Sequence, residues 1–200
     1  MESMQVEKPG SGALDSIDYA ILYVVYSLNT ETSRKVINKV IARAVLIHGD
    51  RLEPLKDLLD ALRINHFGWV IEGVDGRLRR LEGMGLVRLR LDGRRLFVSP
   101  TSSVNRDDVL KRAERELPSE FVLRLKESLS KLSLDRVDDF VNELEKLSGI
   151  AGIKYALIGF SAREYLDLMN RLREIGTPCP ECPSSDEFLE LRRKIKDLPG

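Results

Sequence analysis

Apolar residues recur at helical spacing along most of the chain. The first run predicts a helix over 16–28, which Asp15 or Ser16 would cap, and the next runs predict helices over 34–48, 50–62 and 69–81. After Pro100 the pattern predicts helices over 109–117, 121–132, 137–147, 161–175 and 188–198, while 153–160 fits either a short strand or a helix. The chain is therefore expected to be mainly α-helical.

Two of these helices leave alternatives open. Gly73 and Gly76 weaken the helix over 69–81, because each glycine costs a helix interior about 1 kcal/mol relative to alanine, so its regular part could begin at Asp75. In the first helix, three tyrosines form a second stripe: Tyr19, Tyr23 and Tyr26. Such a stripe indicates ordinary amphipathic packing or, alternatively, a contact between subunits.

Two alternating runs, 86–91 and 94–99, flank Asp92-Gly93 and predict a β-hairpin. With Asp92-Gly93 as the loop, Arg90 would lie opposite Arg95, and Arg88 would share their face. Like charges placed opposite one another oppose strand pairing by a few tenths of a kcal/mol to about 1 kcal/mol, unless an anion lies between them. An anionic partner would relieve this repulsion. For the hairpin taken alone we favour the alternative, in which the arginines point into solvent or pair with acidic residues elsewhere, and it is the sequence around the hairpin that shifts the balance.

The charge of the whole chain is balanced, with 32 basic and 32 acidic residues. Its distribution is uneven, since the segment 77–95 holds seven arginines against Glu82 and Asp92. This concentration adds weight to a polyanionic partner. Because Glu82 and Asp75 lie within one helical turn, we expect at least one of Arg77, Arg79 and Arg80 to pair with an acidic neighbour.

The order of helices, turn, arginine-bearing helix and basic hairpin resembles the winged helix-turn-helix domain. The segment 76–101 reads GRLRRLEGMGLVRLRLDGRRLFVSPT and is similar to the end of the recognition helix and the wing of PadR-type and MarR-type transcriptional regulators. The resemblance spans roughly 16–101. It implies that Trp69, Arg77, Arg79 and Arg80 lie in or beside the major groove of double-stranded DNA, and that the wing arginines lie against phosphates or the minor groove: Arg88, Arg90, Arg94 and Arg95.

Composition further narrows the class of protein to which the chain can belong. The chain is 42% hydrophobic and 32% charged, a globular balance, and its longest uncharged apolar run, 20–27, is far shorter than the roughly 18 residues of a membrane span. The polar start of the chain has no secretory pattern, so we expect a cytoplasmic protein with no membrane contact. The excess of arginine over lysine and the single glutamine hint at a thermophilic source, which we expect to be archaeal.

No cofactor, metal or catalytic arrangement is predicted. The only cysteines are Cys179 and Cys182, and the sequence offers no further ligands to complete a zinc site with them. Three interpretations stay open: two exposed thiols, a disulfide, or a redox switch or zinc site shared by two chains. There is no nucleophile elbow, phosphate-binding glycine loop or His-Glu-x-x-His motif. An enzyme is therefore not expected.

These observations predict a mainly α fold with a small β-hairpin wing: a flexible tail over 1–15, a winged-helix domain over 16–103 and a helical dimerisation or effector domain over 104–200. The predicted function is a sequence-specific DNA-binding transcriptional regulator that acts as a homodimer. The alternative is a winged-helix protein-interaction module in a transcription, replication or chromosome-maintenance assembly, whose basic hairpin binds an acidic protein surface.

Overall fold

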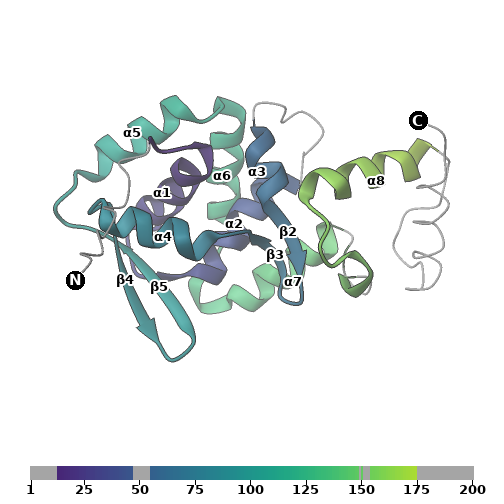
Figure 1. The fold of residues 1–200 in the computed structure, drawn as a ribbon, viewed down its shortest axis with the longest axis horizontal. Helices are drawn as coiled ribbons and strands as arrows, with labels where there is room; N and C mark the ends of the chain where they lie inside the picture. Colours follow the sequence, from purple (N-terminus) through teal and green to yellow (C-terminus); the bar gives the residue numbers. More distant parts are fainter. Residues whose placement is uncertain (1–12, 47–54, 149, 151–153, 175–200) are drawn as a thin grey trace, which may run out of the picture.

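The computed structural model describes residues 13–46, 55–148, 150 and 154–174 (Figure 1). Their helices are α1 (Ser16–Leu28), α2 (Arg34–Leu46), α3 (Lys56–Ala61), α4 (Val74–Gly83), α5 (Arg106–Glu116), α6 (Ser119–Lys131), α7 (Val137–Leu147) and α8 (Ala162–Glu174), with 3₁₀ turns η3 (Leu134–Arg136) and η4 (Lys154–Leu157). The strands are β1 (Thr32–Ser33), β2 (Leu62–Asn65), β3 (Gly68–Ile71), β4 (Val87–Asp92) and β5 (Arg95–Pro100). The fold is mainly helical with a small β component, as the sequence predicts.

Helix α1 is the central element of the core. Asp15 caps it, and the capping box is reciprocal: the Asp15 side chain accepts from the Asp18 backbone N–H, and the Asp18 side chain accepts from the Asp15 N–H. Every residue from Ile17 to Tyr26 is buried, which is typical of a helix covered on all sides. The helix ends at Asn29, which adopts the left-handed conformation.

The tyrosine stripe of α1 packs inside the chain. Tyr19, Tyr23 and Tyr26 are all buried, the Tyr26 hydroxyl donates to the Leu86 carbonyl, and the Tyr19 hydroxyl accepts from Arg112 on α5. The interpretation that these rings pack within the chain is confirmed, although α1 is buried on all sides and not amphipathic, and the alternative of a subunit contact through these rings is wrong.

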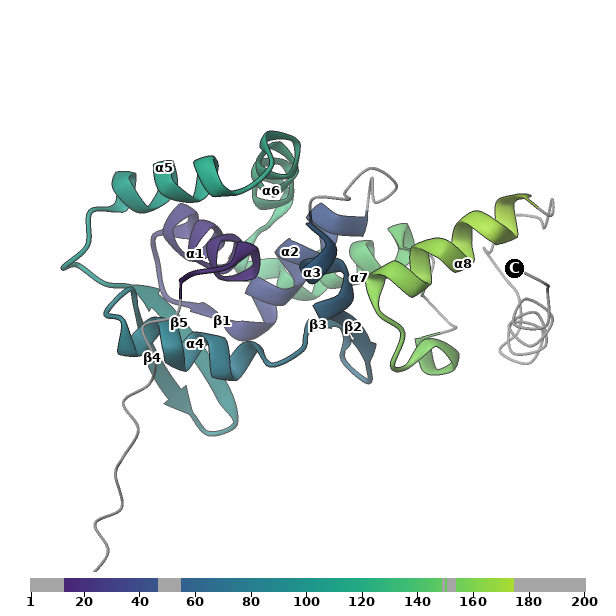
Figure 2. The same cartoon turned by 45° about the horizontal axis from the view of Figure 1, so that its top comes forward.

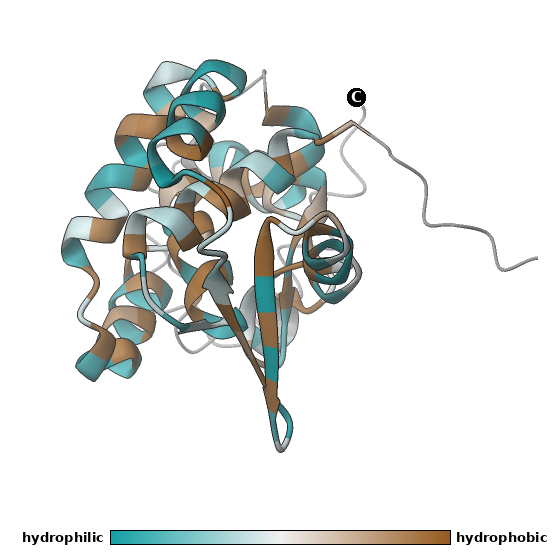
Figure 3. Cartoon of the chain, turned by 90° about the vertical axis from the view of Figure 1, so that its left-hand side faces the viewer, coloured by the Kyte–Doolittle hydropathy of each residue, from teal (hydrophilic) through white to brown (hydrophobic). Residues whose placement is uncertain are grey.

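Three antiparallel strands form the larger sheet, in the order β1-β5-β4. The short strand β1 pairs with β5 through Thr32 and Val98, which anchors the base of the β4–β5 hairpin to the chain just before α2. In Figure 3 the hairpin projects beyond the helices and alternates between hydrophobic and hydrophilic residues.

The helix expected over 69–81 begins at Val74, five residues after its predicted start and one residue before Asp75, the alternative start that Gly73 and Gly76 suggested. Residues Gly68–Ile71 instead form β3, which pairs with β2 in a second hairpin, and α4 begins at Val74. Positive φ angles at Gly68 and Gly73 bracket the strand, and the β-branched and aromatic residues between them favour an extended conformation. The same pairing ends α3 at Ala61, so Leu62 of the predicted helix over 50–62 lies in β2. The start of that helix lies outside the described residues.

The helices after Pro100 follow the predicted pattern and cover the N-terminal helices. Helix α5 lies along α1, α6 lies along α2, and α7 also contacts α2 (Figure 2). Their buried residues belong to the same apolar core as α1 and α2, for example Ala113, Phe121 and Leu144. The residues on both sides of position 104 therefore share one core, and the proposed domain boundary stays a prediction.

The ambiguous segment 153–160 contains the 3₁₀ turn η4. After this turn the backbone pairs with β2, because the Ile64 N–H donates to the Phe160 carbonyl and the Gly159 N–H donates to the Ile64 carbonyl. These bonds fix the start of α8, whose expected capping box is present: Ser161 and Glu164 bond to each other's backbone N–H. The predicted helix over 188–198, Cys179 and Cys182 lie outside the described residues.

Candidate nucleic-acid interface

The β4–β5 hairpin has a different register from the one expected. Asp92 pairs with Arg95 and Leu89 pairs with Val98, so the two-residue loop is Gly93-Arg94. Gly93 adopts a φ of 58° at the first loop position, where a residue with a side chain is disfavoured. Because the loop lies one position later in the chain than expected, every residue pairs with a partner two positions further along the other strand. Strand faces alternate with a period of two, so each residue stays on its expected face.

In this register Arg90 lies opposite Phe97 and not opposite Arg95, the partner expected from the sequence. Its guanidinium carbon lies 4.7 Å from the centroid of the Phe97 ring. Its nitrogens donate to both carboxylate oxygens of Glu31, at 2.9 and 2.6 Å, and this hydrogen bonding lowers the pKa of Glu31. Arg90 and Arg95 are therefore not directly opposite each other, and the alternative that these arginines pair with acidic residues elsewhere is confirmed for Arg90.

Two of the three arginines on α4 are also paired, with carboxylates at the start of α1. Arg77 donates to Asp15 at 2.6 Å and to Asp18 at 3.2 Å, and Arg80 donates to Asp18. The expectation of acidic partners for this group is confirmed, but the expected partners Asp75 and Glu82 are wrong. Glu82 accepts instead from the Leu89 N–H on β4, and Asp75 pairs with Arg34 on α2.

The Asp18 side chain is fully buried between these arginines. Burial raises the pKa of Asp18, although the Asp15 N–H and the two guanidinium charges act in the opposite direction. For Asp15, burial would also raise the pKa, but hydrogen bonds from Arg77 and from the Asp18 backbone outweigh it and the pKa is lowered. The cluster fixes α4 against the first turn of α1.

Trp69 cannot contact DNA through its side chain, contrary to the expectation from the resemblance. It is 0% exposed on β3, its ring packs edge-on against Tyr165 of α8, and its indole N–H donates to the Ser148 hydroxyl at 3.4 Å. The site residue predicted at this position is therefore a core residue. Trp69 stands where the sequence pattern does not distinguish a helix from a strand, so the sequence gives no signal that separates a core residue from a DNA-contacting residue at this position.

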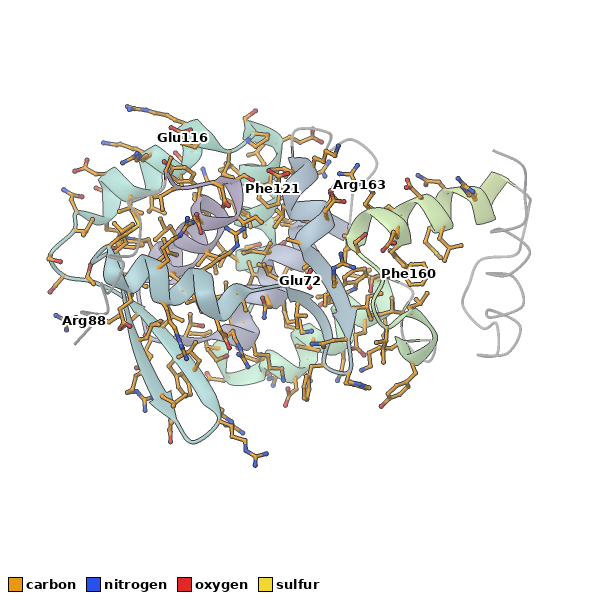
Figure 4. The ribbon with its side chains drawn as sticks, in the orientation of Figure 1. Glu72, Arg88, Glu116, Phe121, Phe160 and Arg163 are labelled. Carbon is orange, nitrogen blue, oxygen red and sulfur yellow. The ribbon has the colours of Figure 1, made fainter. Side chains whose placement is uncertain are left out.

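Four arginines of the basic segment remain exposed and have no ion pair within 4 Å in the described part of the chain: Arg79 on α4, Arg88 on β4, Arg94 in the loop and Arg95 on β5. Arg88 lies at the outer edge of the molecule (Figure 4). Arg95 lies opposite Asp92 in the hairpin, and its charge also reaches Asp138 on α7. The pKa of Asp138 is lowered by the Lys35 hydrogen bond and, to a smaller extent, by the charge of Arg95.

Helix α4 presents its exposed Arg79 between two exposed glycines. Gly76 and Gly83 lie on the same side of the helix as Arg79, and no heavy atom comes within 4 Å of a Cβ built at either glycine. A partner could therefore approach the α4 backbone on both sides of the guanidinium group.

The residues that sequence reasoning missed are those that hold this surface in place. Glu31 and Asp18 neutralise arginines from distant elements, and Asn38 of α2 accepts from the Ile71 N–H at the end of β3. The capping-box spacing of Asp15 and Asp18 was visible in the sequence, but their partners on α4 were not.

Neither models of known protein families, nor curated proteins, nor solved structures give a match to this chain. Within the described residues, no helix is long and apolar enough to cross a membrane, and no group of three or more His, Cys, Asp or Glu side chains could hold a metal ion. The function therefore has to be argued from the surface itself.

Proposed function

We propose that the chain is a winged helix-turn-helix protein that binds double-stranded DNA and regulates transcription. The order of elements supports this proposal: α1, β1 and α2 are followed by α4 and directly by the β4–β5 hairpin, and β1 pairs with the last strand. In this scheme α4 is the recognition helix and the β4–β5 hairpin is the wing. The insertion of α3 and the β2–β3 hairpin before α4 is a variation on that order.

The observation that carries the proposal is the division of the seven arginines in 77–95. Three of them pair with carboxylates of the chain, whereas Arg79, Arg88, Arg94 and Arg95 stay exposed on two elements that contact each other, α4 and β4–β5. Exposed guanidinium groups on a helix and a projecting hairpin suit contacts to phosphates, and we propose that Arg79, the exposed arginine of α4, reads a guanine.

Two chains on a two-fold axis would place two α4 helices about 34 Å apart, one turn of duplex, as a palindromic operator requires. Most apolar side chains of α5, α6 and α7 pack within the chain, whereas Leu123 on α6 and Leu147 on α7 are exposed. We therefore propose that the pairing of two chains uses other surfaces of residues 104–200. Sedimentation at increasing protein concentration tests the dimer directly.

A second candidate is a protein-interaction module. It is favoured by the acidic start of α7, where Asp138 lies close enough to Arg95 to sense its charge. A carboxylate beside the wing would repel phosphates, and its position supports a wing that lies against an acidic protein surface.

Binding to duplex DNA across a salt series tests the proposal. The first variant replaces the four exposed arginines with glutamine: Arg79, Arg88, Arg94 and Arg95. The matched control removes the same charge from four exposed basic side chains on other elements, Lys56, Lys111, Arg115 and Arg171, which have no ion pair in the described part of the chain.

We expect the first variant to bind more weakly and to flatten the dependence of log K on log salt by about 0.9 for each phosphate that is no longer neutralised. The control should keep both the affinity and the slope. If the two variants behave alike, non-specific attraction explains the binding. If the unmodified chain has no measurable duplex affinity at moderate salt but forms a stoichiometric complex with an acidic protein, the second candidate is correct.

A further inference from the structure

The turn of the β2–β3 hairpin holds an exposed phenylalanine rigidly. Phe67 is 79% exposed, yet its N–H donates to the Asn65 side chain at 2.7 Å, and its carbonyl accepts from Lys39 at 2.6 Å. The Lys39 side chain is itself buried and also donates to the Trp69 carbonyl at 2.9 Å. Two hydrogen bonds thus fix the backbone of Phe67, while its ring contributes almost nothing to the core.

The turn residue next to Phe67 contacts a second exposed aromatic ring. The ring of His66, the other turn residue, lies 6.2 Å from the ring of Tyr155 on η4, and Tyr155 is 72% exposed. We call His66, Phe67 and Tyr155 the aromatic tip. It joins two segments that are far apart in the sequence.

The charges next to the aromatic tip are not balanced. Lys154 pairs with Glu145 at 3.2 Å, and Lys39 interacts with the same carboxylate. Two ammonium groups therefore share one carboxylate, which leaves an excess positive charge directly behind the exposed rings. Exposed aromatic rings over positive charge are the combination that stacks on bases and attracts phosphates.

The aromatic tip lies on the same side of the molecule as the proposed wing. Both hairpins point downward in Figures 1 and 2, and α4 leads from the end of β3 to the start of β4. A duplex that lies along α4 and contacts the β4–β5 hairpin therefore extends past the β2–β3 hairpin.

We propose that the β2–β3 hairpin is a second nucleic-acid contact, in which Phe67 packs against the bases of the duplex bound by α4 and the β4–β5 hairpin. The inference rests on the proposed function. Because the turn is already fixed by Asn65 and Lys39, binding orders little additional backbone, and the apolar ring acts as a wedge at a base step, as in proteins that partly unstack DNA. Lys39 and Lys154 supply the charge that draws the phosphates toward the tip.

The test compares Phe67→Ala, which removes a side chain that is 79% exposed, with Leu123→Ala, which removes an apolar side chain of α6 that is 65% exposed. Sedimentation first checks that both variants keep the oligomeric state of the unmodified chain. Neither change should alter the urea midpoint, because neither side chain is buried. The probe is duplex DNA carrying 2-aminopurine, whose fluorescence rises when the base is unstacked. We expect the unmodified chain and Leu123→Ala to raise the fluorescence, and Phe67→Ala to abolish the rise and to weaken binding by roughly 5- to 150-fold.

A photo-crosslinking benzoylphenylalanine at position 67 gives an independent reading. A crosslink to the duplex supports the proposal, whereas a crosslink to a protein in whole-cell extract, with none to DNA, overturns it in favour of a protein contact. If Phe67→Ala binds like the unmodified chain while the four-arginine variant does not, the second contact is wrong and the proposed function stands. If the unmodified chain does not bind the duplex, both are wrong.

Discussion

Replacing the buried carboxylate of Asp18 tests how α4 is held. The Asn side chain of Asp18→Asn has nearly the same shape but no charge, and it can still accept the N–H of Asp15 through its one oxygen. The change removes the negative partner of Arg80 and one of the two negative partners of Arg77. The two guanidinium groups would keep their partly buried positions without full compensation.

The expected loss of stability can be worked out from these hydrogen bonds and ion pairs. Two hydrogen bonds to charged groups contribute about 1.5 to 3 kcal/mol each, and breaking a fully buried ion pair costs about 3 to 5 kcal/mol. Arg77 and Arg80 are 25% and 31% exposed, so water compensates for part of this loss. We therefore expect Asp18→Asn to lower the free energy of unfolding by about 2 to 4 kcal/mol, measured as a lower urea midpoint at an unchanged m-value.

The control is Asp138→Asn, which breaks the exposed pair with Lys35. The Asp138 side chain is 85% exposed, and exposed pairs contribute about 0 to 1 kcal/mol. A loss for Asp18→Asn that is no larger than the loss for Asp138→Asn would refute the view that the buried carboxylate holds α4 in place.

Three further side chains give measurable outcomes. Burial lowers the pKa of Lys39 to about 8, so between about pH 8 and 10.5 the unfolded chain binds more protons than the folded chain. The free energy of unfolding should therefore rise with pH over this range by up to about 1.4 kcal/mol per pH unit, and urea titrations of Lys39→Met should lack this rise. Trp69→Phe should lower the free energy of unfolding by about 1 to 3 kcal/mol but leave the duplex affinity unchanged, and DNA should not shift the fluorescence emission of the single tryptophan. A large drop in duplex affinity at unchanged stability would contradict the place of Trp69 in the core. A double-mutant cycle of Arg90→Ala and Phe97→Ala should give a coupling energy of about 0.5 to 1 kcal/mol, whereas a cycle of Arg90→Ala and Arg95→Ala should give almost none. A larger coupling between Arg90 and Arg95 than between Arg90 and Phe97 would support the register expected from the sequence.

Most of the helical fold could be predicted because its signals are local. The cap at Asp15, the apolar period of α1 and α2, and the patterns of α5, α6 and α7 all predict the elements that the structure contains. The prediction for the short segment before α4 was wrong for a physical reason. Residues Gly68–Ile71 form a strand because β2 is available as a partner, and that pairing between neighbouring strands outweighs a weak helical period.

The site was less predictable than the fold, because each arginine depends on partners from other elements. The seven arginines of 77–95 look alike in the sequence, yet Glu31 lies 59 residues before Arg90 and Asp18 lies 59 residues before Arg77. A shift of one position in the hairpin loop was enough to replace the expected Arg95 beside Arg90 with Phe97. Hydrophobic alternation fixes the faces of a strand, but the conformation of a single glycine in the loop decides which side chains oppose one another.

The paired arginines also compensate for what α4 lacks as a helix. It buries only three apolar side chains, Val74, Leu78 and Leu81, and it contains Gly76 and Gly83, which lower its intrinsic stability. The ion pairs to α1 therefore supply part of the binding that a larger apolar face would give. Because the Asp18 carboxylate is fully buried, salt screens these pairs far less than it screens the exposed arginines. A salt series that weakens duplex binding should thus leave α4 in place. The part of the slope that is lost in the four-arginine variant therefore reports the contacts of Arg79, Arg88, Arg94 and Arg95 with the phosphates and not the undocking of the helix that carries Arg79.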